Sequence, residues 1–455
     1  MNIRLNLSTL IAAGIAAVAI TVSVAACGGG NSSGGTVDAP SAPNQGASAP
    51  TGSAPTDPTA TASSPAGFAA GVTGGAGGEV VTVSTADQLV HELCRTMAST
   101  GCTDTAARTI KIESTIDFTS KSLTPVAGCL TPNTASPTKT CAAPKQREIM
   151  LTAQDWQLPY CDGQTKSTYN YDPVGTGGIR IGSNKTLLGV GANAGIKGRG
   201  LLLKQGVTNV IIRNISITDI NEGKVWGGDA LTINDATGVW VDHNRFARIG
   251  RQLLVTGDGT ATAKVDMLTV SNNEFDGHTD YSIDCNSRHY WNILLYANGR
   301  VTMAGNWLHD FDGRAPKIIS QGTGAVVQVA NNLFENSGGH ALDYEGDPTL
   351  VLLEGNQFLN VPSPVAGSAD PAHRGKLFGF YASTTAATAA TASCNAAFGR
   401  PCKANIASPA PKTDYMAQDS APIDAMKSEA TRLVTPYATE DVPTAVRAHA
   451  GVGKI

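Results

Sequence analysis

The chain has 455 residues, of which 41% are hydrophobic, and its 33 basic side chains nearly balance its 37 acidic ones. This balance excludes the strongly basic surface expected of a nucleic-acid-binding protein. Glycine is abundant, with 50 residues, and aromatic residues make up only 5%. Such a composition disfavours a helix bundle and favours many short strands joined by tight turns.

The first 26 residues predict a secretory signal peptide. Arg4 lies in a short polar start, and the uncharged apolar run that follows extends from residue 10 to 26, which is short of the ~20 residues of a spanning helix. The sequence VAACG at 24–28 resembles a bacterial lipobox, in which Cys27 would be lipidated and become the mature N-terminus. The alternative is an ordinary signal peptide that is cleaved nearby, with Cys27 discarded. We therefore expect a secreted protein or a cell-surface or outer-membrane lipoprotein of a bacterium, held to the membrane only by its lipid.

Residues 27–77 predict a disordered linker. They are mostly Gly, Ser, Ala, Thr and Pro with almost no charge, and Phe68 is their one aromatic residue. Such a segment buries too little apolar surface to offset the entropy lost on ordering. It would tether the domain that follows, residues 78–455, away from a membrane.

Eight cysteines follow Cys27, and an even number in an exported protein predicts four disulfides. Their spacing alone leaves the pairing open. A metal site is disfavoured, because no C-x₂-C pair or His-rich partner is present. The eight are Cys94, Cys102, Cys129, Cys141, Cys161, Cys285, Cys394 and Cys402.

A repeat between residues 239 and 358 predicts the fold. Each unit is an apolar strand followed by Asn, one further residue and then Phe or Leu, and the asparagines recur every 24 to 33 residues. A looser unit at 210–215 precedes them. This period indicates stacked coils, and leucine-rich repeats are excluded because the helical half is missing. We predict an all-β, right-handed parallel β-helix in which the asparagines form a ladder. They are Asn244, Asn273, Asn306, Asn332 and Asn356.

The last 80 residues, 376–455, break this pattern with Ala-, Thr- and Pro-rich loops and a helix-like stretch at 422–433. We expect this tail to wrap around the β-helix and to carry no chemistry. Function in a β-helix is expected in a cleft built by the loops of adjacent coils.

Four segments carry a family resemblance: VWGGD at 225–229, ARIGRQ at 247–252, HYW at 289–291 and GRAPK at 313–317. Together they resemble the pectin lyases, the calcium-independent branch of the pectate/pectin lyase superfamily, and the fungal type in particular. The resemblance extends over about residues 80–400 and is densest from 178 to 357. By the same likeness we expect the disulfides Cys129–Cys161 and Cys141–Cys285, with the local pairs Cys94–Cys102 and Cys394–Cys402.

The resemblance implies a β-elimination that cleaves internal bonds of methyl-esterified homogalacturonan, pectin, and leaves unsaturated methyl-ester oligomers. A base removes the C5 proton, the 4-linked oxygen departs, and negative charge develops on the C6 carbonyl oxygen, where cations stabilise it. Pectate lyases hold Ca²⁺ for this purpose with several carboxylates. Arg251 stands where further acidic ligands are expected, and a guanidinium repels an ion that needs six to eight oxygens. We therefore expect no cofactor and no metal.

The resemblance also implies the site residues. Arg314 is the expected catalytic residue, with Arg251, Lys317 and Asp229 as its partners. Arginine is normally protonated, so its action as a base requires neighbouring cations that favour the neutral form; its alternative role is electrophilic, with hydroxide or another group taking the proton. Aromatic surfaces should bind the sugar faces. The candidates are Trp226 and Trp291, and less strongly Tyr281, Tyr290 and Trp156.

Several features limit this interpretation. Tyr160 precedes Cys161 where the fungal enzymes lead us to expect tryptophan, and Asp242-His243 is interpreted as structural. The alternatives are a calcium-dependent pectate lyase and a non-catalytic carbohydrate-binding β-helix. A hydrolase of this fold would need paired carboxylates across the cleft. No acidic cluster of that kind is recognisable, and only Asp229, Asp235 and Asp242 leave this alternative open. We expect a monomer.

Overall fold

The computed structural model describes residues 64–455, except residue 100 and the segments 132–139, 258–263, 368–372 and 383–385. The chain divides into two units, 1–54 and 55–455, and everything below concerns the second. The predicted signal peptide and Cys27 lie outside the described residues. Among the residues that are described, no helix is long and apolar enough to cross a membrane.

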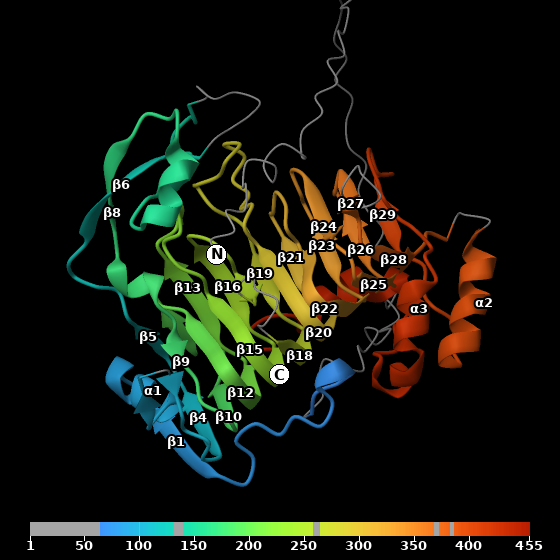
Figure 1. Ribbon diagram of the computed structural model, residues 1–455, viewed down its shortest axis with the longest axis horizontal. Helices are drawn as coiled ribbons and strands as arrows, with labels where there is room; N and C mark the ends of the chain where they lie inside the picture. Colours follow the sequence, from blue (N-terminus) through green and yellow to red (C-terminus); the bar gives the residue numbers. More distant parts are fainter. Residues whose placement is uncertain (1–63, 100, 132–139, 258–263, 368–372, 383–385) are drawn as a thin grey trace, which may run out of the picture. The chain divides into compact units, whose positions relative to one another are not determined.

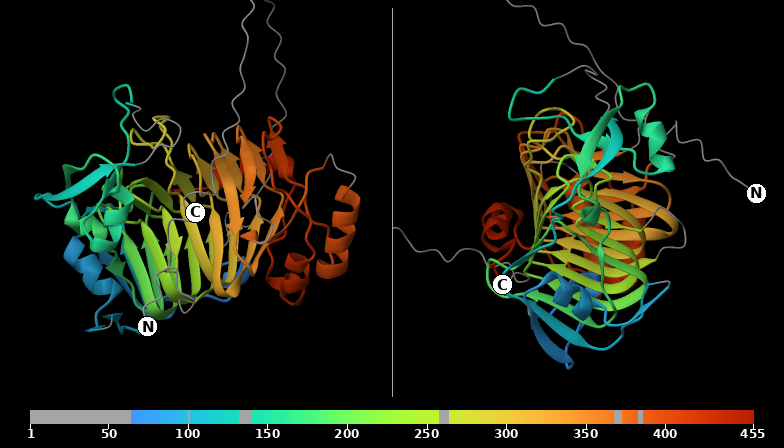
Figure 2. Two further views of the ribbon diagram at one scale, coloured as in Figure 1. Left: turned by 45° about the horizontal axis from the view of Figure 1, so that its top comes forward. Right: turned by 90° about the vertical axis from the view of Figure 1, so that its left-hand side faces the viewer.

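Two sheets of parallel strands build the molecule, as the sequence repeat predicts. The coils follow one another along the sheets, so that each strand pairs with its counterpart one coil away (Figures 1 and 2). Long strands of the first sheet pair with two strands of the next coil: β15 pairs with both β17 and β18. This arrangement is a right-handed parallel β-helix. The first sheet comprises β1 (Glu79–Val83), β4 (Arg108–Ile112), β9 (Ile179–Arg180), β10 (Lys185–Gly189), β12 (Leu201–Arg213), β15 (Leu231–Asp242), β17 (Leu254–Thr256), β18 (Val265–Ser271), β20 (Ile293–Ala304), β22 (Lys317–Ala330), β24 (His340–Glu345), β25 (Thr349–Glu354), β27 (Ser363–Gly367) and β28 (Lys376–Gly379).

The second sheet runs through the same coils. It comprises β5 (Thr115–Asp117), β11 (Gly195–Lys197), β13 (Ser216–Ile220), β16 (Arg245–Ile249), β19 (Glu274–Asp276), β21 (Trp307–His309), β23 (Leu333–Glu335), β26 (Gln357–Leu359) and β29 (Ile406–Ser408). A third, four-stranded sheet is formed by β6 (Thr124–Leu130), β7 (Ile149–Leu151), β8 (Ser167–Tyr171) and β14 (Lys224–Val225), and β2 (Met97–Ala98) pairs with β3 (Gly101–Cys102).

The predicted asparagine ladder is confirmed. Each side-chain oxygen accepts the backbone N–H of the ladder asparagine one coil earlier, at 2.9–3.0 Å, and its side-chain N–H at 2.8–3.0 Å. The ladder continues to Asn405, which the sequence pattern missed. At its other end Ile215 occupies the ladder position and donates its N–H to Asn244, while the preceding Asn214 bonds the carbonyl of Gly189 instead.

The residues two positions after the ladder fill the interior. Phe246 stacks on Phe275 with ring centroids 5.1 Å apart, and Phe334 stacks on Phe358 at 4.7 Å. Leu308 lies between the two pairs in the strand register. All five side chains are buried, and each contributes about 1.5–3 kcal/mol through burial.

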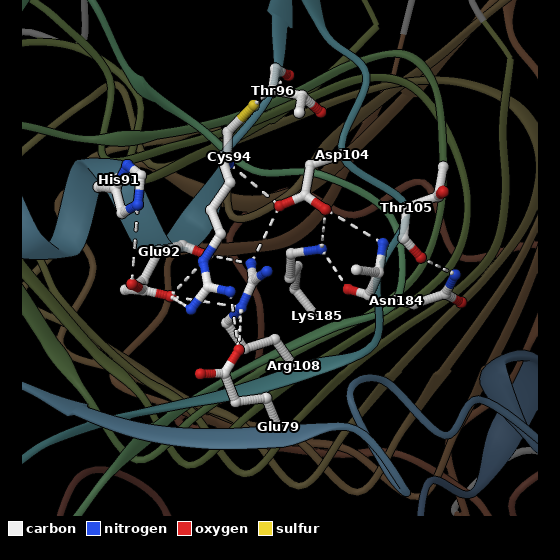
Figure 3. Close-up of polar contacts among 12 residues, drawn as sticks. Glu79, His91, Glu92, Cys94, Thr96, Asp104, Thr105, Arg108, Asn184 and Lys185 are labelled. Atoms are coloured by element: carbon white, nitrogen blue, oxygen red, sulfur yellow. Dashed lines mark hydrogen bonds and ion pairs between the residues drawn. The ribbon is translucent and has the colours of Figure 1, made fainter.

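A buried ionic cluster lies under the first coil (Figure 3). Helix α1 (Ala86–Leu93) begins with a capping box at Thr85 and covers this end. Asp104 accepts a bond from Arg108 at 2.9 Å and pairs with Lys185 at 3.3 Å. Burial by itself raises the pKa of Asp104, but the backbone N–H of Arg95 and the guanidinium of Arg108 outweigh it and lower the pKa to about 2.

The predicted linker extends too far, because its last part packs on the β-helix. Phe68, in the short helix η2 (Gly67–Ala69), is fully buried, and its N–H donates to Thr302 at 3.1 Å. The N–H of Ala69 donates to Thr269 at 3.0 Å, and that of Gly74 to Asn209 at 2.8 Å. Composition could not reveal this, since the contacts that offset the ordering entropy come from residues far along the chain.

The tail begins later than predicted, because β28 and β29 add a further coil to both sheets. The predicted helix at 422–433 corresponds to α3 (Ala421–Met426) followed by η6 (Lys427–Arg432). Helix α3 packs next to β28, and helix α2 (Ala386–Phe398) lies beside α3 (Figure 1). The last helix, α4 (Val442–His449), follows η7 (Thr439–Asp441) and packs on Leu333 of the second sheet. The four disulfides join the pairs that the resemblance implies.

Candidate active site

The third sheet forms one wall of the candidate site. The disulfide Cys129–Cys161 joins β6 to the short helix η3 (Asp155–Cys161). With Met150 and Val225 it forms a small apolar cluster. Three aromatic side chains pack on this cluster: Tyr160, Trp226 and Trp291. The insertion between β5 and β8 therefore brings aromatic rings over the coils.

A cavity of about 250 Å³ lies in front of this wall. Its lining comes from the insertion and from the coils that carry Trp226 and Arg251. Its lining includes Trp156, Tyr171, Trp226, Asp229 and Arg251. Four of the residues singled out from the sequence, Trp156, Trp226, Asp229 and Arg251, thus line one cavity.

Arg251 lies between a ring and a carboxylate. Its guanidinium carbon is 4.1 Å from the ring centroid of Trp226, and Nη1 is 3.8 Å from Oδ2 of Asp229. The other Asp229 oxygen accepts the N–H of Gln252 at 2.9 Å. Burial lowers the pKa of Arg251; Asp229 opposes this change, and the charge of Arg314 adds to it.

Glycine is required beside Arg251. The N–H of Arg251 donates to the carbonyl of Gly228 at 3.2 Å. Gly228 has φ +135°, and a Cβ atom there would lie 2.1 Å from the carbonyl oxygen of Gly175. The close backbone approach in the 225–229 segment explains the glycine at this position.

Arg314 lies against the second pair of rings. Its guanidinium carbon is 4.7 Å from the ring centroid of Trp291 and 5.6 Å from that of Tyr290. Buried Asn292 holds this arrangement, because its side chain donates to the carbonyls of both His289 and Gly313. The segments at 289–291 and 313–317 are thereby tied together.

Both arginines keep a free donor. The Nε atoms of Arg251 and Arg314 are buried and have no hydrogen-bond partner within the described part of the chain. A buried N–H without a partner is costly unless a ligand satisfies it. The site is therefore suited to a ligand with acceptor oxygens.

Lys317, one of the predicted site residues, is held by two carboxylates. Its ammonium pairs with Asp343 at 3.0 Å and Glu345 at 2.9 Å. Burial disfavours its charge, but these two carboxylates outweigh burial and raise its pKa. Its charge acts on Arg314 while being balanced by two acids.

The remaining aromatic candidates divide. Trp156, a weak candidate from the sequence, is 52% exposed and lies edge-on to Trp226 at 4.7 Å. Tyr160, which stands where tryptophan was expected, is 5.5 Å from the same ring. Tyr290 packs edge-on to Trp291 at 5.1 Å. Tyr281 instead packs over Gly223, where a Cβ would lie 2.3 Å from the ring.

Two buried residues of the site received no role in the sequence analysis, although His289 begins the HYW segment singled out there. Glu148, which is fully buried, accepts the indole N–H of Trp291 at 2.9 Å, and His289 contacts the carbonyl oxygen of Arg251 at 2.6 Å. No local pattern marks Glu148, because it lies 143 residues before its partner.

The residues around Asp229 do not fit a calcium ion, which takes six to eight oxygens, since a guanidinium lies 3.8 Å from its carboxylate. Among the described residues, Glu274, Asp276 and His309 form the group close enough together to hold a metal. They lie on the second sheet, where Arg245 already pairs with both acids, at 3.3 and 2.5 Å. Burial disfavours a charged His309, but Asp310 and Glu274 outweigh it and raise its pKa to about 9.

Comparison with known proteins identifies the class. A family described as pectate lyase matches residues 165–455. The chain therefore belongs to the pectate lyase family. A solved pectate lyase from Paenibacillus sp. 0602 has the same fold, with a TM-score of 0.51 at 13% identity over 86% of this chain and 96% of that chain.

Within this family the chain is most like pectin lyases. It is 40% identical to probable pectin lyase E of Aspergillus fumigatus over 393 residues, which cover 85% of this chain and 94% of the relative. It is 38% identical to pectin lyase B of Emericella nidulans over 340 residues, 74% of this chain and 80% of the relative.

The expected localisation needs correction. These relatives are fungal proteins, which conflicts with a bacterial cell-surface or outer-membrane lipoprotein. That prediction relied on five residues around Cys27, and so short a motif occurs by chance.

Proposed function

We propose that the protein is a pectin lyase that cleaves internal bonds of methyl-esterified galacturonan by β-elimination, without a metal ion. One observation carries the proposal. Arg251 and Arg314 lie against the rings of Trp226 and Trp291, and each keeps a buried, unpaired Nε–H. Two arginines with unpaired donors, each held against an aromatic ring, suit a carbonyl oxygen on which negative charge develops.

The arginines stabilise the transition state. Removal of the C5 proton places negative charge on the C6 carbonyl oxygen, and donors fixed in advance lower the energy of that charge without reorganising. Electrostatic stabilisation is stronger here than in water because the rings exclude solvent. A methyl ester carries no charge of its own, so Arg251, joined by Arg314 once it has taken the C5 proton, supplies the positive charge that the reaction needs.

Arg314 is the proposed base. It takes the C5 proton, the electron pair forms the C4–C5 double bond, and the C4–O bond breaks with the departing oxygen taking a proton from solvent. Arg251 assists by holding its guanidinium against the ring of Trp226, where its charge stabilises the negative charge that develops on the C6 carbonyl oxygen. Lys317, held by two carboxylates, is proposed to position β22 rather than to touch substrate.

The aromatic side chains are the proposed sugar platforms. Trp226 with Trp156 and Tyr160 forms one group, and Trp291 with Tyr290 forms the other. Rings bind the apolar faces of sugars and the ester methyl groups. An aromatic platform beside each arginine suits a substrate that extends over several sugars, and hence cleavage of internal bonds.

The alternatives are not favoured. Calcium-dependent action needs an oxygen cage where the guanidinium of Arg251 lies. A non-catalytic binding protein is not favoured, because the relatives at about 40% identity are pectin lyases. A hydrolase needs two available carboxylates, yet Asp242 is fully buried and pairs with Arg213 and His243. We also propose that residues 1–26 direct secretion, since four disulfides require an oxidising compartment, and that the enzyme acts as a monomer.

The products test the proposal. Methylated oligogalacturonides would be incubated with the protein in EDTA and analysed by mass spectrometry. β-Elimination leaves an unsaturated fragment that is lighter by one water than the fragment formed by hydrolysis. Cleavage of internal bonds gives mid-sized fragments before monomers appear. The matched variant Arg314→Ala should give neither. Saturated products, or unchanged substrate with the wild-type protein, would contradict the proposal.

A further inference from the structure

A buried acid and a buried histidine connect the two halves of the active site. Glu148, which precedes β7, is fully buried, and His289, between β19 and β20, is 5% exposed. Glu148 Oε2 accepts the indole N–H of Trp291 at 2.9 Å, and His289 Nε2 lies 2.6 Å from the carbonyl oxygen of Arg251. The remaining polar atoms of the two side chains face each other, because Nδ1 of His289 lies 3.4 Å from Oε1 of Glu148.

The hydrogen bonds fix the number of protons in this pair. A carbonyl oxygen only accepts, so the proton of the His289–Arg251 bond belongs to Nε2. Nδ1 of a neutral imidazole would then present a lone pair to the carboxylate. Within the described residues, Oε1 of Glu148 has no hydrogen-bond donor, and a buried carboxylate without a partner is costly. A second ring proton, on Nδ1, removes both conflicts.

None of the charged side chains described around the pair donates a hydrogen bond to Oε1 of Glu148 in place of this proton. The side chain of Arg147 donates to the carbonyl of Thr131. Arg251 and Arg314 direct their guanidinium groups over Trp226 and Trp291. Asp312 donates its N–H to the carbonyl of His289 at 2.9 Å. Burial is the main reason why the pKa of Asp312 is raised to about 6, and the charge of nearby Asp284 adds to the rise. A hydrogen bond from Asn286 and the charge of Arg288 oppose it.

We propose that Glu148 and His289 are positioning residues that form a buried carboxylate–imidazolium pair, which holds the Arg251 half of the cleft in place against the Trp291–Arg314 half. This inference rests on the proposed lyase function. Without the Nδ1 proton, a lone pair faces a carboxylate and the two segments move apart. Because misplacement by about 1 Å can cost about 100-fold in rate, activity depends on this proton.

The substitution Glu148→Gln tests the role of the shared proton separately from that of the packing contacts. In Glu148→Gln the amide oxygen still accepts from Trp291, and the amide N–H donates to Nδ1 of a neutral His289. The same contacts then form without a shared proton. We expect kcat/KM at neutral pH within about 3-fold of wild type and the alkaline limb of the pH profile displaced upward or abolished. Glu148→Ala, which loses both contacts, should lower kcat about 30- to 100-fold and also raise KM, because Trp291 is released.

A matched control is Glu335→Gln. Glu335 accepts the indole N–H of Trp307 at 3.0 Å on the second sheet, outside the cleft. This variant likewise replaces a carboxylate that accepts an indole N–H by an amide, and it should leave the pH profile unchanged. A shift of the alkaline limb in both variants, or in neither, would overturn the proposal.

A second readout does not depend on lyase activity. In protein labelled with ¹⁵N-histidine, the two ring nitrogens of His289, assigned by comparison with His289→Asn, should both carry protons at neutral pH in the wild type. Only Nε2 should do so in Glu148→Gln. An unprotonated Nδ1 in the wild type would refute the ion pair even if pectin is cleaved. Two protonated nitrogens without pectin cleavage would support the pair and refute the proposed function alone.

Discussion

Replacing Arg251 by glutamine tests the core of the proposed mechanism. The change removes a guanidinium that lies 4.1 Å from the ring centroid of Trp226 and 3.8 Å from the carboxylate of Asp229. Glutamine keeps a similar length and a polar end but carries no charge. The buried Nε–H, which has no hydrogen-bond partner among the described residues, is lost as well.

The magnitude follows from what the guanidinium does in each state. Removing one preorganised donor at a developing oxyanion costs about 10²- to 10³-fold in kcat, or about 3–4 kcal/mol. KM should change little, because the charge appears only in the transition state. The folded state loses a cation–π contact of about 0.5–2 kcal/mol and a partly exposed ion pair of about 1 kcal/mol. The catalytic loss should therefore exceed the loss of stability.

The assay compares two arginines in one segment. Initial rates on methylated pectin would be followed by the ultraviolet absorbance of the unsaturated product, with urea unfolding measured in parallel. Arg248→Gln is the control, because Arg248 pairs with Asp219 at 2.6 and 2.9 Å, away from the cavity, and should retain wild-type kcat. The reasoning is refuted if Arg251→Gln keeps most of its kcat, or if both variants lose activity equally.

Two further predictions concern stability. Asp104 is 5% exposed, and lowering its pKa from 3.8 to about 2 corresponds to about 2.5 kcal/mol. That contribution is complete above the unfolded-state pKa and disappears as pH falls through about 2, so urea unfolding of wild type and Asp104→Asn should differ at pH ~6 and converge in strong acid. A constant difference across pH would contradict it. Asn306→Ala removes bonds to Val270 and Asn332 and the acceptor for the N–H of Asn273. Buried groups left without partners cost about 1–3 kcal/mol each, so unfolding free energy should fall by about 2–5 kcal/mol; a loss below 1 kcal/mol would mean that the ladder is not a source of stability.

The sequence could predict the β-helix because a stacked fold repeats its constraints. Every coil from Asn244 to Asn356 needs a polar side chain for the ladder and a large apolar side chain two residues later, so the period is visible without a structure. The prediction stopped at Asn356 because the next ladder residue, Asn405, follows 49 residues later, after the insertion that contains α2. An insertion between coils changes the spacing without changing the stacking.

The site was predictable only where its residues lie in recognisable segments. Arg251 and Arg314 were found from the motifs around them. Glu148 comes from the insertion between β5 and β8, whose sequence has no period and which the Cys129–Cys161 disulfide links internally. The balanced charge of Lys317 was missed for a similar reason, since its carboxylate partners lie on β24, one coil later.

The metal-free elimination is tested most directly by one comparison of rates. Formation of unsaturated product would be measured on highly methylated pectin in EDTA and on de-esterified pectate with Ca²⁺, using the same preparation. The arrangement of Arg251 beside Asp229 predicts rapid product formation from methylated pectin with the chelator present and little from pectate. Activity confined to pectate with Ca²⁺ would contradict it.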